Sequence, residues 1–142
     1  MLIRTALISD SHEISRLSGE LGYAAEASQM AERLRDLTEQ RDNIVYVADS
    51  GNQLLGWIHA QVRVLVEAPR FVEITGLVVD SAHRGEGIGR QLIAQTEVWA
   101  AQSGFTKLRV RTNQKRSDAV QFYNRLGFVL VKSQHVLDKS IE

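Results

Sequence analysis

The chain has 142 residues, a length that fits one domain of ordinary size. Hydrophobic residues make up 44% and charged residues 24% of it, a balance that excludes an intrinsically disordered protein. Lys plus Arg and Asp plus Glu each number 17, and this zero net charge disfavours a dedicated nucleic-acid binder. The chain has no cysteine, which excludes a disulfide framework, a cysteine nucleophile and a thiolate metal site.

Targeting and metal-binding signals are missing from the sequence. No apolar run approaches the roughly 20 residues that a membrane span needs, and residues 1–10 lack the basic start and apolar stretch of a signal peptide. None of the four histidines has metal-ligand spacing to another. We therefore expect a soluble cytoplasmic protein with no metal, no membrane partner and no nucleic-acid partner.

The first half of the chain predicts a strand, two helices and three more strands. Residues 2–7 indicate an edge strand. Two apolar stripes at helical spacing follow, at Ile14, Leu17 and Leu21 and at Met30, Leu34 and Leu37. Three runs rich in β-branched and aromatic residues come next, at 44–48, 54–66 and 71–79. Short connections between these runs favour an antiparallel meander.

The second half returns to helical spacing. A long helix is predicted from about Gly87 to Gln102, then a strand at 108–111 and a short helix at 118–126. Two more short strands are expected at 128–131 and 136–137. The elements together predict an α/β (α+β) protein with a mixed sheet and helices on its faces. They form one domain over residues 1–142.

A glycine-rich turn, residues 84–90, separates the strand at 71–79 from the long helix. Gly85, Gly87 and Gly89 carry no Cβ, and the first amides of a helix have no intrahelical acceptor. This combination predicts an anion site, because a phosphate can approach the backbone closely. The spacing fits neither a dinucleotide-binding fingerprint nor a P-loop. The alternative is that the glycines only permit a tight connection.

Two segments resemble motifs of the GNAT superfamily of N-acetyltransferases. Residues 84–89, Arg-Gly-Glu-Gly-Ile-Gly, match the (Q/R)-x-x-G-x-(G/A) signature, and residues 119–128 resemble the segment A-x-x-F-Y-x-x-x-G-F. The order of the elements also agrees, so the resemblance covers nearly the whole chain. It implies a mostly antiparallel sheet with a splayed central pair of parallel strands.

The resemblance implies acetyl-CoA as co-substrate. In the family the glycine turn binds the pyrophosphate, and Leu77 faces the acetyl carbonyl while Val78 and Val79 pair with pantetheine. An asparagine at position 113 matches a cofactor contact, whereas Arg116 replaces a second asparagine found in many members. The implied pyrophosphate-binding residues are Arg84, Gly85, Glu86, Gly87, Ile88, Gly89 and Arg90.

Two catalytic residues follow from the same resemblance. Tyr123 matches the tyrosine beside the CoA sulfur, and its phenol can protonate the leaving thiolate. Glu73 matches a glutamate that some members use as general base. In plain strand alternation Glu73 shares a face with Leu77, so a bulge must intervene for the two to face differently. A core tyrosine and a surface carboxylate are the structural alternatives, and His59 is expected to be a hydrogen-bonded strand residue.

The function expected is transfer of acetyl from acetyl-CoA to the primary amine of a small molecule. Without a cysteine, direct attack in a ternary complex is the expected mechanism. A protein or peptide acetyltransferase, acting on lysine or an N-terminus, is the second reading. The third is an acetyl-CoA-binding sensor without turnover. Homodimers are common in the family, and nothing in the sequence names the acceptor amine.

Overall fold

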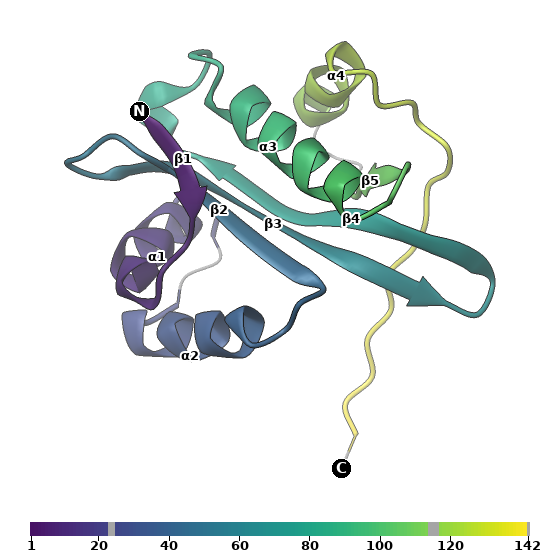
Figure 1. The fold of residues 1–142 in the computed structure, drawn as a ribbon, viewed down its shortest axis with the longest axis horizontal. Helices are drawn as coiled ribbons and strands as arrows, with labels where there is room; N and C mark the ends of the chain where they lie inside the picture. The colour runs from purple at the N-terminus through teal and green to yellow at the C-terminus, as the bar shows by residue number, and fades with distance from the viewer. Residues whose placement is uncertain (23–24, 114–116, 142) are drawn as a thin grey trace. The chain divides into compact units, whose positions relative to one another are not determined.

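The computed structural model describes residues 1–22, 25–113 and 117–141. It divides into two compact units, Met1–Arg111 and Thr112–Glu142. The first unit holds one five-stranded sheet in the order β1-β2-β3-β4-β5 (Figure 1). The first three neighbouring pairs are antiparallel and β4 with β5 is parallel. The strands are β1 (Leu2–Thr5), β2 (Asn43–Asp49), β3 (Leu54–Leu65), β4 (Ala68–Val79) and β5 (Leu108–Val110).

Helices cover both faces of this sheet. The helices α1 (Ser11–Gly19) and α2 (Ala27–Thr38) lie on one face, and α3 (Ile88–Gln102) lies on the other (Figure 1). Two short 3₁₀ turns, η1 (Ile8–Asp10) and η2 (Ser81–His83), precede α1 and follow β4. The structure thus confirms the three helices and the strand meander predicted for residues 1–111.

Two apolar layers hold the sheet between its helices. The layer under α1 and α2 includes Trp57 beside a buried cluster: Ala6, Ile14, Leu17, Met30, Leu34, Val45, Val47, Leu54 and Val78. On the other face, the fully buried Leu92 and Ile93 of α3 supply the apolar stripe. Both faces of the sheet therefore carry apolar side chains, and each face is covered by helices.

Gly56 lies where α3 side chains pack against the sheet. A Cβ at this position would lie 2.8 Å from the carbonyl oxygen of Val78, 3.2 Å from Leu92 and 3.3 Å from Ile88. We expect Gly56→Ala to lower the free energy of unfolding by about 1–3 kcal/mol, because backbone cannot move aside as a side chain can. Urea unfolding of the wild type and of the variant measures this difference in the free energy of unfolding. Gly19→Ala, where a Cβ meets nothing within 4 Å, should be neutral or slightly stabilising, and equal stability of both variants would contradict the packing described.

A β-bulge in β4 changes which residues face which side. His59 of β3 pairs with Gly76, whereas the next residue, Ala60, pairs with Ile74. Thr75 is therefore the extra residue of the bulge. Because directly opposed residues share a face, Glu73 and Leu77 lie on opposite faces of the sheet. The sequence analysis required such a bulge if Glu73 and Leu77 were to lie on different faces, and the structure has it.

The second unit contains one helix, α4 (Ser117–Arg125), which confirms the helix predicted at 118–126. The strands expected at 128–131 and 136–137 are wrong, since residues 126–141 form no strand. Val129, Leu130 and Val136 are 79%, 69% and 84% exposed. β-branched residues favour a strand only where a neighbouring strand and a packed face receive them, and this segment has neither within its unit.

Candidate active site

The glycine turn has the backbone that an anion site needs. Gly85 and Gly87 have φ angles of +82° and +83°, in the left-handed region that glycine adopts at little cost. Gly87 caps α3, and its carbonyl accepts from the amide of Gln91 at 3.1 Å. The amides just after Gly87 therefore have no intrahelical acceptor. A Cβ on either glycine would meet nothing within 4 Å, so the space beside these two glycines is open.

Side chains of the turn divide into exposed and buried sets. Arg84, Glu86 and Arg90 are exposed, and the Glu86 carboxylate lies 3.1 Å from Nδ1 of His83. Ile88 and Gly89 are buried where α3 meets the sheet. Backbone amides, with two exposed arginines nearby, are therefore what the turn offers to a ligand.

Asp80 caps the 3₁₀ turn η2, which leads into the glycine turn, a role that the sequence analysis missed. Its carboxylate is buried, accepts from the amide of Ala82 at 2.9 Å and pairs with the Arg16 guanidinium at 3.1 Å. Arg16 also donates to the carbonyl of Leu54 at 2.9 Å. The hydrogen bond from Ala82, and then the one from Arg16, hold the pKa of Asp80 below its usual value. An aspartate directly after a strand is a helix-capping signal, and that signal was available in the sequence.

The edge of β4 turns two amides toward the splay between β4 and β5. The β4–β5 ladder ends at the pair Ile74 and Val110. The amide of Asp80 donates to Leu55 of the β3 side at 2.8 Å. Strand alternation therefore points the N–H groups of Leu77 and Val79 away from β3, and that of Val78 toward it. Two backbone donors facing one gap are suited to a thioester oxygen and a pantetheine amide.

A polar triplet lies at the bulge on the face that α1 and α2 cover. His59 Nε2 lies 2.8 Å from Oδ1 of Asn43, and His59 Nδ1 lies 2.8 Å from Oγ1 of Thr75. Burial lowers the pKa of His59 below its usual value, which keeps the ring neutral near pH 7. The hydrogen bonds expected for His59 are present, and their link to an exposed threonine at the bulge was not foreseen.

Glu73 lies in a cluster of arginines. Its side chain is only 5% exposed, with Oε1 2.7 Å from Nε of Arg111 and Oε2 3.8 Å from Nε of Arg63. The guanidinium of Arg109 stacks 4.5 Å from the ring centre of Phe71, two residues before Glu73. We call Arg63, Arg109 and Arg111 the arginine cluster. Arg111 and Arg63 face the Glu73 carboxylate, and Arg109 is its partner in the β4–β5 ladder.

Tyr123 belongs to α4 in the second unit. Its ring packs edge-on against Phe122 and Phe128, with centroid separations of 5.1 and 5.4 Å. Burial raises the pKa of Tyr123 to about 12, so the phenol stays protonated at neutral pH. It is a half-buried tyrosine between aromatic rings that retains its proton, as a general acid must.

The last predicted cofactor contact, Asn113, is exposed in the second unit. Arg116, which replaces the family's second asparagine, lies outside the described residues.

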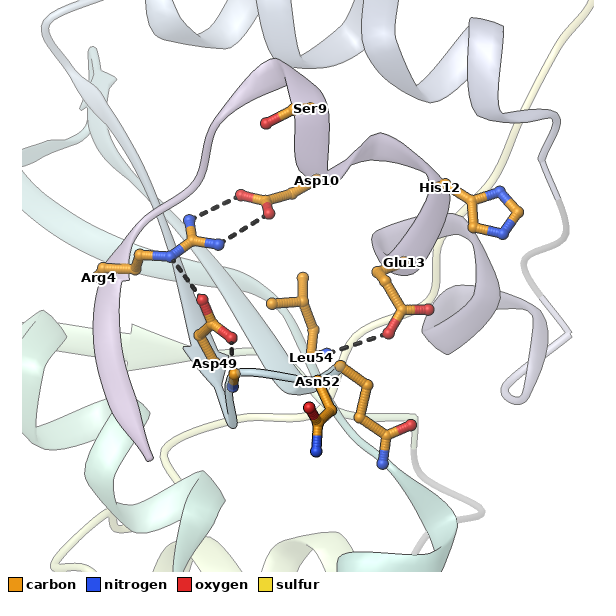
Figure 2. A pocket seen from close by; sticks show the side chains of 10 residues that line it. Arg4, Ser9, Asp10, His12, Glu13, Asp49, Asn52 and Leu54 are labelled. Atoms are coloured by element: carbon orange, nitrogen blue, oxygen red, sulfur yellow. Dashed lines mark hydrogen bonds and ion pairs between the residues drawn. The ribbon is translucent and has the colours of Figure 1, made fainter.

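A separate pocket of about 340 Å³ opens where α1 meets the β2–β3 turn (Figure 2). Arg4 spans it, with two hydrogen bonds of 2.8 and 2.9 Å to Asp10 and one of 3.1 Å to Asp49. Glu13 accepts from the amide of Leu54 at 3.0 Å. Arg4 thus links Asp10 of η1 to Asp49 of β2, and we interpret the polar lining of the pocket as structural.

No helix in the described part of the chain is long and apolar enough to cross a membrane.

Comparison with known proteins shows the family of this chain. Aminoalkylphosphonate N-acetyltransferase of Salmonella typhimurium is 34% identical over 79% of this chain and 71% of that protein. Rat N-acetyltransferase 8B is 28% identical over 71% of this chain, which spans about half, 46%, of that relative's length. The structure of aminoglycoside 6'-N-acetyltransferase from Acinetobacter haemolyticus superposes with a TM-score of 0.84 over the full length of both chains, at 21% identity. The model of the Acetyltransferase (GNAT) family matches residues 11–128, and the chain therefore belongs to the GNAT family of acetyltransferases.

Proposed function

We propose that this protein transfers an acetyl group from acetyl-CoA to the primary amine of a small molecule by direct attack in a ternary complex. The observation that carries the proposal is the continuity of the site in the first unit. Outward-facing amides at Leu77 and Val79 lead into a left-handed glycine turn at the start of α3. With no cysteine in the chain, a cysteinyl acetyl-enzyme has no place in the mechanism.

Each group of the site has a stated task. Bound acetyl-CoA supplies the thioester carbonyl and a thiolate leaving group. The turn amides from about Arg84 to Arg90 would hold the pyrophosphate, Val79 the pantetheine, and Asn113 the cofactor arm. Val78, which the resemblance also implied for pantetheine, leaves this set because its N–H and its carbonyl point toward β3. The Leu77 amide would stabilise the oxyanion of the tetrahedral intermediate, and Tyr123 would protonate the thiolate. Glu73 is the general base that the resemblance implies, and a loss of rate in Glu73→Gln alone would support that role.

The acceptor is proposed to be an amine that also carries an anionic group. The arginine cluster supports this, because guanidinium forks bind phosphonate and carboxylate groups well and repel polycations. Within the described residues, the buried Nε of Arg63 makes no hydrogen bond and lies 3.8 Å from the Glu73 carboxylate. The Arg63 side chain is 36% exposed. The Salmonella relative is named for aminoalkylphosphonates, which combine an amine with such an anion.

Arg63→Gln tests the acceptor class. It should raise the KM for aminomethylphosphonate by about 10-fold, the loss of roughly one charge-assisted hydrogen bond, and should leave acetyl-CoA affinity unchanged. Arg33→Gln, at an exposed position of α2, is the matched control and should behave as wild type. The readout is CoA-thiol release over a range of acceptor concentrations. An unchanged KM in Arg63→Gln, or a preference of the wild type for the polycation sisomicin, would contradict an anionic acceptor.

A binding and turnover screen tests the proposed function itself. Calorimetric titration with acetyl-CoA, followed by CoA release with aminomethylphosphonate, sisomicin and a lysine peptide, should show tight binding and turnover with a small amine. Turnover with the peptide alone would favour the protein acetyltransferase. Binding with no acetylation of any amine would favour the sensor. One domain over residues 1–142, a cytoplasmic location and a homodimer remain predictions.

A further inference from the structure

We propose that Thr75, His59 and Asn43 form a proton relay that accepts the proton of the acceptor amine, with Thr75 as the residue that touches the amine. The inference rests on the proposed function and adds to it the route of the proton. An alkyl amine has a pKa near 10.4 and is protonated at neutral pH, so it must lose a proton before it attacks the thioester.

Thr75 stands where that proton must be taken. It is the extra residue of the β4 bulge, directly after Ile74, where the pairing with β5 ends, and two residues before Leu77. It is exposed, whereas the residues 71–74 before it are all buried. Bulges commonly redirect a side chain toward an active site. This one places a hydroxyl on the α1–α2 face, beside the splay.

The hydrogen bonds behind Thr75 define one direction for the proton. The amide Nδ2 of Asn43 donates to Oε1 of Gln40 at 2.8 Å, which leaves Oδ1 of Asn43 facing Nε2 of His59 at 2.8 Å. The amide assignment therefore places the ring proton on Nε2 and leaves Nδ1 as an acceptor. Thr75 Oγ1 lies 2.8 Å from that Nδ1, closer than its 3.2 Å to the His59 carbonyl oxygen.

The proton transfers balance along this path. The ammonium gives one proton to Thr75 Oγ1 as the threonine hydroxyl gives its own to His59 Nδ1, and the Nε2–H of the imidazolium keeps its bond to Asn43. The neutral amine then forms the N–C bond and the C–S bond breaks. Tyr123 protonates the thiolate and regains its proton, through solvent, from the second proton on nitrogen. His59 returns its proton to water.

The relay gives His59 and Glu73 different tasks. His59 is neutral near pH 7 because burial lowers its pKa, so Nδ1 has a lone pair available. Both carboxylate oxygens of Glu73 face guanidinium groups of Arg111 and Arg63. In the relay, Glu73 holds the side chains of the arginine cluster in position. His59 is the positioning residue that accepts the proton of the Thr75 hydroxyl.

Single-turnover measurements on four variants test the relay at neutral pH. The wild type and each variant, saturated with acetyl-CoA, are mixed with aminomethylphosphonate, or with sisomicin if the wild type prefers it. His59→Gln keeps an acceptor for the Thr75 hydroxyl but cannot take its proton, and Thr75→Val keeps only the shape. Both should slow the chemical step by about 100-fold, at the lower end of the usual range for one proton transfer. Thr75→Ser should recover most of the rate, and Glu73→Gln is measured beside these variants as the loss of the competing base.

Hydroxylamine provides the matched control, since it is largely unprotonated at neutral pH and needs no base. With it, His59→Gln and Thr75→Val should react as fast as wild type, which a collapsed site would not do. The double variant should be no slower with the alkyl amine than either single variant, because both remove one path. Full rates in His59→Gln and Thr75→Val, or a loss only in Glu73→Gln, would overturn the relay. A wild type that acetylates no amine would contradict the proposed function and the relay with it.

Discussion

Replacement of Gly87 by valine is expected to weaken acetyl-CoA binding by at least about 100-fold. The φ of +83° at this position is strained for a β-branched residue, and the side chain would fill the open space over the α3 amides. A hydrogen bond to a charged group contributes about 1.5–3 kcal/mol, so losing two of them from the pyrophosphate suffices for this effect. Calorimetric titration with acetyl-CoA measures it.

Gly104→Val separates ligand blocking from backbone strain. Gly104 lies just past the other end of α3 with a φ of +87°, and a Cβ there also meets nothing within 4 Å. The two substitutions therefore carry similar strain on the same helix, but only Gly87 lies at the amide end. Gly104→Val should destabilise the fold to a similar extent and bind acetyl-CoA normally. Equal affinities for Gly87→Val and Gly104→Val would remove the turn from the cofactor site.

Loss of the Tyr123 hydroxyl is expected to slow the chemical step by about 10- to 1000-fold, at or below the usual range for one proton transfer. A thiolate leaving group has a pKa near 8.5 and departs partly unaided, so the acid is useful rather than essential. Tyr123→Phe keeps the ring and its contacts with Phe122 and Phe128, so acetyl-CoA affinity should stay within a few-fold. Rapid-quench single turnover measures the step itself.

The raised pKa of Tyr123 adds a test by pH. With a pKa of about 12, the phenol keeps its proton through alkaline conditions, so wild-type turnover should show no loss from its ionisation below that value. The raised pKa also makes the free energy of unfolding depend on pH. Above pH 10 the tyrosine ionises in the unfolded chain but not in the folded one, so the free energy of unfolding falls as pH rises toward 12. Tyr46→Phe, at a half-buried tyrosine of β2, is the control for a lost hydroxyl. An unchanged chemical step in Tyr123→Phe would leave the tyrosine a packing role only.

The glycine turn is the part of the site that the sequence predicts well. Glycine at positions 85 and 87 and the apolar stripe of α3 are local signals, and they place the helix start within one residue of Ile88. Local patterns likewise fix the meander of β2, β3 and β4. The requirement for a bulge beside Glu73 also follows from alternation alone.

Features that depend on pairing between distant segments are not predictable in this way. The arginine cluster brings Arg63 of β3 together with Arg109 of β5 and Arg111 just after it. The triplet at the bulge joins Asn43, His59 and Thr75 from three strands. Neither the arginine cluster nor the triplet has a spacing in the sequence that would predict it. The strands expected at 128–131 and 136–137 fail for the same reason, because their β-branched residues predict a strand without supplying a partner for it.

The central claim is that this site moves acetyl from acetyl-CoA to the nitrogen of a small anionic amine. Incubation with acetyl-CoA labelled at the acetyl carbonyl and with aminomethylphosphonate, followed by NMR and thiol titration, tests it most directly. We predict a labelled N-acetyl product that forms one for one with free CoA, and no product with Gly87→Val at the same acetyl-CoA concentration. Release of CoA with the label appearing as acetate, or product formation undiminished in Gly87→Val, would contradict the account.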